Sequence, residues 1–162
     1  TVNFTDAEHR FKHCMSLVEF KIKPGQGVKD NNYRFNRLEL KGIFRSGQFD
    51  TRTGAVITIG DRGSIRRDFD DVYFENEESF AYIMLPQSLE SNKMDIEIYL
   101  LLNDSEVKYT TPITPSTNGQ FEGGKKYTYN ITVKNTGITI ENANIVPWGY
   151  GDSGNLDADI EL

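Results

Sequence analysis

Four residues near the end of the chain, Gly151-Asp152-Ser153-Gly154, could in principle carry a catalytic serine. They spell the tetrapeptide around the nucleophile of trypsin-like proteases, where the serine works with a histidine base and an aspartate. The Gly-Pro that continues that pattern is replaced here by Asn155-Leu156, and both histidines of the chain lie within its first thirteen residues. A flexible Gly/Ser-rich linker explains the four residues better. We therefore expect no catalytic residue and no enzyme activity.

Two groups of residues suggest a metal site. His9 and His13 are spaced to share one helix face, but Arg10 stands where a helical zinc motif needs Glu. Residues 61–78 hold clustered acids, which would suit calcium, but their spacing matches no calcium loop. The acids include Asp68, Asp70, Asp71, Glu75, Glu77 and Glu78. We interpret 61–78 as a long solvated polar loop and predict no metal and no cofactor.

Composition limits the class of protein. The chain has 162 residues, 37% of them hydrophobic and 12% aromatic, which is enough apolar surface for one folded domain. Its formal net charge of −6 argues against a nucleic-acid partner, because phosphates would be repelled. The sequence contains no apolar run long enough for a transmembrane segment. Because it begins with Thr1 rather than Met, we interpret it as a mature product or a part of a longer precursor.

The clearest structural pattern lies in residues 123–148. Apolar or aromatic residues at 127, 129, 131 and 133 alternate with polar ones at 128, 130 and 132, as in a strand with one buried face. Lys134-Asn135-Thr136-Gly137 then makes a short connection, and Ile138 and Ile140 resume the alternation. A return strand ends at Pro147, which cannot donate to a central ladder.

Similar runs predict further strands at residues 13–23, 36–44, 55–60, 79–85, 94–102 and 106–111. Seven or more short strands separated by turns are typical of a two-sheet antiparallel β-sandwich, which this pattern alone does not distinguish from an immunoglobulin-like fold. In the first strand Cys14 shares a face with Val18, Phe20 and Ile22, so we expect a buried, unreactive thiol.

The chain divides into one domain and a tail. Residues 1–148 form a single β-sandwich domain with a lead-in at 1–12, where Thr5 and Glu8 could cap one helical turn. Residues 149–162 are a Gly-rich linker and a strand-like tail. In the tail, Leu156, Ala158, Ile160 and Leu162 alternate with Asp157, Asp159 and Glu161. This pattern suits an edge strand or a donor strand with one wet face, although terminal residues also fray.

Three stretches together resemble a known family. They are GGKKYTYNITVKNTGITIENANIVPW at 123–148, His13–Val18 running into Lys23-Pro24-Gly25-Gln26-Gly27, and Phe49-Asp50 with Thr53-Gly54 followed by Leu85-Pro86-Gln87. In this order they resemble the fimbrillin-like proteins, the pilus and cell-surface adhesion subunits of Bacteroidetes. The resemblance implies a transthyretin-like, Greek-key sandwich. It also implies a non-enzymatic fimbrial subunit or adhesin at the cell surface, attached to the outer membrane.

The same resemblance implies partners. Subunits of this family assemble by β-strand addition, so other fimbrial subunits are the expected partners, together with a host or bacterial surface ligand. The alternative function is a carbohydrate-binding β-sandwich module, with Tyr99, Trp148 and Tyr150 as aromatic contacts to a glycan. For Trp148, packing under the last strand competes with that role.

Overall fold

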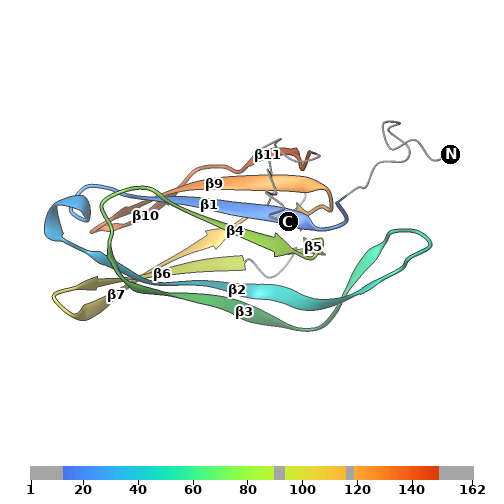
Figure 1. Ribbon diagram of the computed structural model, residues 1–162, viewed down its shortest axis with the longest axis horizontal. Helices are drawn as coiled ribbons and strands as arrows, with labels where there is room; N and C mark the ends of the chain where they lie inside the picture. Colours follow the sequence, from blue (N-terminus) through green and yellow to red (C-terminus); the bar gives the residue numbers. More distant parts are fainter. Residues whose placement is uncertain (1–12, 90–93, 116–118, 150–162) are drawn as a thin grey trace, which may run out of the picture.

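The computed structural model describes residues 13–89, 94–115 and 119–149 (Figure 1). In chain order the elements are β1 (Ser16–Pro24), the short 3-10 helix η2 (Lys29–Asn31), β2 (Arg34–Phe49), β3 (Val56–Tyr73), β4 (Glu78–Met84), β5 (Gln87–Ser88), β6 (Met94–Leu102), β7 (Ser105–Ile113), β8 (Gln120–Phe121), β9 (Lys125–Lys134), β10 (Gly137–Ile140) and β11 (Asn144–Pro147).

Two sheets pack face to face. The first has the order β10-β9-β1-β4, with β11 also paired to β9, and the second has the order β3-β2-β6-β7. Strands β5 and β8 form a separate two-stranded sheet. The predicted two-sheet β-sandwich is therefore confirmed, while its Greek-key connectivity stays a prediction. All strand pairs are antiparallel except β1 with β9, which run parallel and which no local sequence signal indicated.

Strand β9 lies inside the first sheet, between β1 and the two short strands β10 and β11. Its inward side chains, Tyr127, Tyr129, Ile131 and Val133, are at most 1% exposed, which confirms the predicted alternation. The inward residues of β1 (Ser16, Val18, Phe20 and Ile22) are fully buried beside them. Because the opposing sheet covers the inner face of β9, its polar residues can occupy only the outer face.

Strand β3 corrects one prediction. Residues 61–78 were expected to form a polar loop, but the strand begins at Val56 and continues to Tyr73. It pairs with β2, which is also longer than expected, across three register irregularities. Alternating charged residues such as Arg66 and Asp68 lie on its outer face, so its high polarity reflects a solvated strand rather than a loop.

The β2–β3 hairpin projects beyond the body of the sandwich (Figure 1). Strand β6 pairs with β2 only from Arg34 to Lys41. Beyond Lys41, β2 and β3 continue as a two-stranded ribbon, with Phe44 opposite Arg62 and Phe49 opposite Val56. We call residues 44–62 the arm.

The chain enters and leaves the domain at the same end. The amide of Gly124 donates to the carbonyl of Met15 at 2.8 Å, and that of Trp148 donates to the carbonyl of Gly124 at 2.7 Å. The ring of Trp148 stacks on that of His13, with centroids 3.8 Å apart. The expected burial of Cys14 was wrong, because its side chain is only partly buried here, while its low reactivity stays a prediction.

Candidate functional site: the seam between β3 and β4

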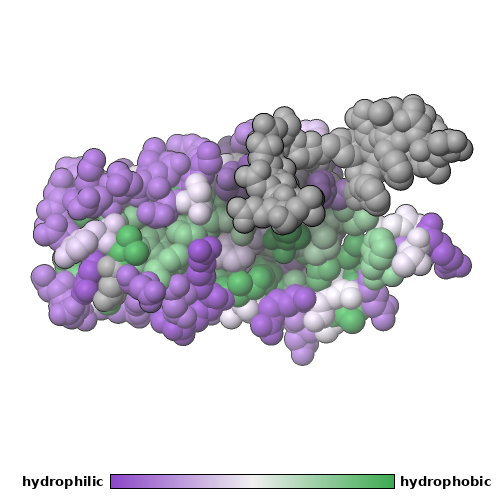
Figure 2. All heavy atoms as spheres, viewed as in Figure 1, coloured by the Kyte–Doolittle hydropathy of each residue, from purple (hydrophilic) through white to green (hydrophobic). Residues whose placement is uncertain are grey.

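One side of the sandwich ends in two edge strands. Strand β3 is the last strand of the second sheet and β4 the last of the first. They face each other across the sandwich, since the rings of Phe69 on β3 and Phe80 on β4 have centroids 5.0 Å apart. We call the inner faces of these two strands the seam: Ile65, Arg67 and Phe69 on β3 and Glu78, Phe80 and Tyr82 on β4. In Figure 2, apolar side chains are visible between the polar outer layers.

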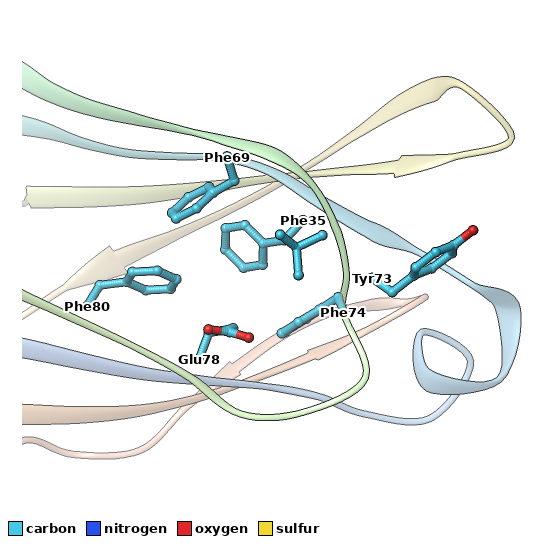
Figure 3. Close-up of a pocket in the computed structure, with 7 residues that line it drawn as sticks. Phe35, Phe69, Tyr73, Phe74, Glu78 and Phe80 are labelled. Atoms are coloured by element: carbon cyan, nitrogen blue, oxygen red, sulfur yellow. The ribbon is translucent and has the colours of Figure 1, made fainter.

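Aromatic side chains line one end of the seam. The ring of Phe35 packs edge-on against those of Phe69 and Phe74, at 4.9 Å and 5.1 Å between centroids. A small cavity of about 40 Å³ opens among these rings, with Glu78 and the exposed Tyr73 at its sides (Figure 3). A cavity of this size, apolar except at Glu78, fits a small aliphatic side chain rather than a cofactor.

A charged side chain lies across the apolar seam. The guanidinium carbon of Arg67 is 5.3 Å from the ring centroid of Phe69 and 5.5 Å from that of Phe80. The Arg67 side chain is exposed, so the charge keeps its hydration while it is attracted to the electron-rich ring faces. An inward-pointing charge on an edge strand is a recognised way to discourage unwanted strand pairing.

The hydroxyl of Tyr82 is a buried polar group without a partner. Among the described residues, its oxygen is inaccessible to solvent and makes no hydrogen bond. Burial raises the pKa of Tyr82, and the nearby Arg67 offsets part of that rise. Leaving a buried hydroxyl unpaired costs free energy, so a group that supplied an acceptor here would be favoured.

The outer face of the second sheet carries a separate charged cluster. Glu97 on β6 is 5% exposed and accepts from Lys41 at 2.8 Å, Lys108 at 2.9 Å and the Tyr99 hydroxyl at 2.5 Å. Burial works against its ionised form, but these three hydrogen bonds outweigh burial and lower the pKa of Glu97 to about 2. With all of its contacts inside the protein, Glu97 serves the stability of the sheet rather than ligand binding.

Two of the three aromatic residues predicted to contact a glycan, Tyr99 and Trp148, lie in the described part of the chain. Tyr99 is 7% exposed, and the Arg37 guanidinium covers its ring at 3.6 Å, so it has no open face for a sugar. Trp148 is partly buried, with one face against His13. Tyr150 lies outside the described residues, as do the tail residues Leu156, Ala158, Ile160 and Leu162.

Sequence reasoning missed the seam. The sequence does alternate here, with Ile65, Arg67 and Phe69 on one face and Ser64, Arg66 and Asp68 on the other. The arginine at an inward position obscured this pattern. Among the described residues, no three His, Cys, Asp or Glu side chains gather as metal ligands. No helix in the described ranges is long and apolar enough to cross a membrane.

The comparisons with known proteins place the chain in a family. The family model for fimbrillin-like proteins matches residues 1–148. The chain belongs to the fimbrillin-like family, as the sequence resemblance predicted. A comparison with curated proteins finds no match.

Solved structures share the fold. A candidate cell adhesion protein from Bacteroides ovatus is 26% identical with a TM-score of 0.62, over 85% of this chain and 46% of that chain. Another from Bacteroides uniformis is 17% identical with a TM-score of 0.64, over 85% and 52%. A fimbrial protein from Bacteroides vulgatus is 14% identical with a TM-score of 0.52, over 85% and 55%. The chain thus spans about half the length of these relatives. Family and neighbours together support a fimbrial role at the cell surface.

Proposed function

We propose that this domain is a non-enzymatic subunit of a bacterial surface fimbria, or a surface adhesin, and that it assembles by β-strand addition at the seam. The observation that carries the proposal is the seam itself, where two edge strands enclose an apolar surface. The fimbrillin-like family and the adhesion proteins among its structural neighbours support the same role.

The seam has what an added strand needs. The edges of β3 and β4 that face away from β2 and β1 pair with no described strand, so their free amides and carbonyls can bond to an extended segment. Apolar side chains of that segment would cover Phe69 and Phe80, and one small side chain would fill the cavity beside Phe35. A backbone carbonyl could accept from the Tyr82 hydroxyl. Arg67 would have to swing outward, which its exposed position allows.

The tail of the chain is our candidate donor. Leu156, Ala158, Ile160 and Leu162 would point into the seam, and the alternating Asp157, Asp159 and Glu161 would stay in water. The linker at 149–154 contains three glycines, which would give the donor the freedom to dock. In an isolated domain the tail can complete its own seam, and in a fibre it can fill that of a neighbour.

Truncation and rescue test this proposal. The chain ending at Gly154 should melt below the full chain, and a peptide of residues 155–162 should bind it and restore the melting temperature. A peptide with Leu156 and Ile160 replaced by Asp is the control and should not bind. Phe69→Asp should abolish peptide binding, whereas Arg66→Asp, three residues away on the outer face of β3, should retain it. If the truncated chain melts like the full one and binds no peptide, the proposal fails.

Outer-membrane attachment belongs to the same proposal and is tested separately. Protease added to intact cells that express the full precursor should digest the domain if it lies on the cell surface. A domain that faced the periplasm would survive the same treatment. Carbohydrate binding remains the alternative function, and within the described residues it now depends on Trp148. Carbohydrate binding would be favoured if a glycan screen detected a ligand whose binding is lost in Trp148→Ala and kept in Tyr99→Phe.

A further inference from the structure

The arm exposes apolar side chains on a two-stranded ribbon. Phe49, Ile57 and Ile59 are 54%, 60% and 41% exposed. Ile57 pairs with Gln48 and Ile59 with Ser46, so the two isoleucines lie on the opposite face of the ribbon from Phe49. A ribbon of two strands is marginally stable in water unless another element packs against it. The arm therefore has surface that a further segment would stabilise.

One face of the arm points toward the point where the chain enters the domain. Gly47 lies against Leu85, because a Cβ on Gly47 would come within 3.0 Å of the Leu85 side chain. Phe49 is two residues farther along the same strand and therefore shares that face. The next residue after Leu85, Pro86, lies beside Gly123, whose Cβ would come within 3.3 Å of the proline ring and 2.5 Å of the Cys14 carbonyl. Cys14 thus lies near the base of the arm.

The free edge of β2 begins at the same place. Where β6 no longer pairs with β2, the side-chain amide of Gln87 takes over, accepting from the Phe44 amide at 2.8 Å and donating to its carbonyl at 3.4 Å. Beyond Phe44, no described strand pairs with β2 on this edge up to Phe49. This stretch can accept an extended segment by main-chain hydrogen bonds.

We propose that residues 1–12 add to the free edge of β2 and cover the Phe49 face of the arm, with Phe4 beside Phe49. The family match includes these residues. Val2 and Phe4 alternate with Thr1, Asn3 and Thr5, the pattern of a strand with one apolar face. From Cys14 back to Phe4 the chain can span about 33 Å when extended, which is ample for this short path. The proposal is independent of strand addition at the seam.

Hydrogen exchange of the full chain tests the proposal. In Phe4→Asp, the amides of residues 45–59 should exchange about tenfold faster or more, because the covering segment is released and the arm opens locally. Asn3→Asp places the same charge on the neighbouring residue of the opposite face and should leave the arm unchanged. Strand β9 should exchange equally in all three proteins. Equal exchange of the arm in Phe4→Asp and the unaltered chain would overturn the proposal.

Cross-linking provides a second measurement that does not depend on stability. With Cys14→Ser removing the native thiol, Phe4→Cys and Phe49→Cys should form a disulfide within one chain under mild oxidation. Phe4→Cys paired with Thr139→Cys, which is exposed on β10, should not. A disulfide found only between two chains would show that a second copy covers the arm, and would overturn the proposal.

Discussion

Strands β9 and β3 show how the position of a strand in its sheet changes what its sequence reveals. Strand β9 is covered on both sides, and its four inward residues are all apolar or aromatic and at most 1% exposed. Strand β3 is an edge strand, and its inward row contains Arg67 between Ile65 and Phe69. An inward position on a central strand excludes an unpaired charge, because the charge would be buried without water. An edge position tolerates one, and the charge then also protects the edge.

The largest effect expected from this comparison is on β9. Val133 is fully buried, so Val133→Asp should lower the free energy of unfolding by more than about 4 kcal/mol, because it buries an unpaired carboxylate. Thr132→Asp, on the outer face of the same strand, should cost about 1 kcal/mol or less. Urea unfolding followed by circular dichroism measures both. Equal losses would mean that the outer face of β9 is also covered.

A second contrast concerns charges. Glu97 on the central strand β6 is 5% exposed, whereas Asp68 on β3 forms an exposed pair with Arg66 at 2.7 Å. Because folding lowers the pKa of Glu97 from 4.5 to about 2, its ion pairs stabilise the protein above about pH 4.5 and are lost as the pH falls toward 2. Glu97→Gln should therefore cost about 2 kcal/mol at pH 7, allowing for screening by solvent at the two lysines.

Asp68→Asn is the control for this experiment. Hydrogen bonds from Arg66 lower the pKa of Asp68, but the pair is exposed and water screens it. Asp68→Asn should therefore change the free energy of unfolding only slightly at any pH from about 2 to about 7, which denaturant unfolding over that range would measure. A destabilisation by Glu97→Gln that did not shrink on acidification would contradict the assignment of Glu97 as an ionised, paired group.

The same contrast explains how much could be predicted from sequence. The sandwich, β9, β6 and β7 followed from alternation, because their inner faces are mainly apolar. The far half of β3 was missed because Arg67 interrupts its inner face. The parallel pairing of β1 with β9 depends on residues more than a hundred positions apart and leaves no local pattern. The cavity beside Phe35 combines residues of β2, β3 and β4, which only the folded chain brings together.

A smaller effect is expected from removing the hydroxyl groups of two tyrosines, the buried Tyr129 and the partly buried Tyr82. Tyr129 on β9 donates its hydroxyl to the Thr114 carbonyl at 3.0 Å, whereas the Tyr82 hydroxyl on β4 is buried without a partner. Tyr129→Phe should lower the free energy of unfolding by about 1 kcal/mol, because the Thr114 carbonyl loses its donor. Tyr82→Phe should be neutral or stabilising by up to about 1 kcal/mol. Thermal unfolding of both variants checks this, and a larger loss at Tyr82 would show that its hydroxyl has a partner.

The smallest change in stability is expected at Arg67, where association rather than unfolding is the informative measurement. Arg67→Val should alter the free energy of unfolding by less than about 0.5 kcal/mol, since the side chain is exposed.

Without the charge, however, the seam becomes an apolar groove between two free edges, and the protein should self-associate at lower concentration. Arg66→Val removes the same side chain from the outer face of β3 and is the matched control. Sedimentation velocity over a concentration series should show association for Arg67→Val alone. If both variants associate equally, or neither does, the inward charge does not protect this edge, and the difference between β3 and β9 is then one of solvent access only.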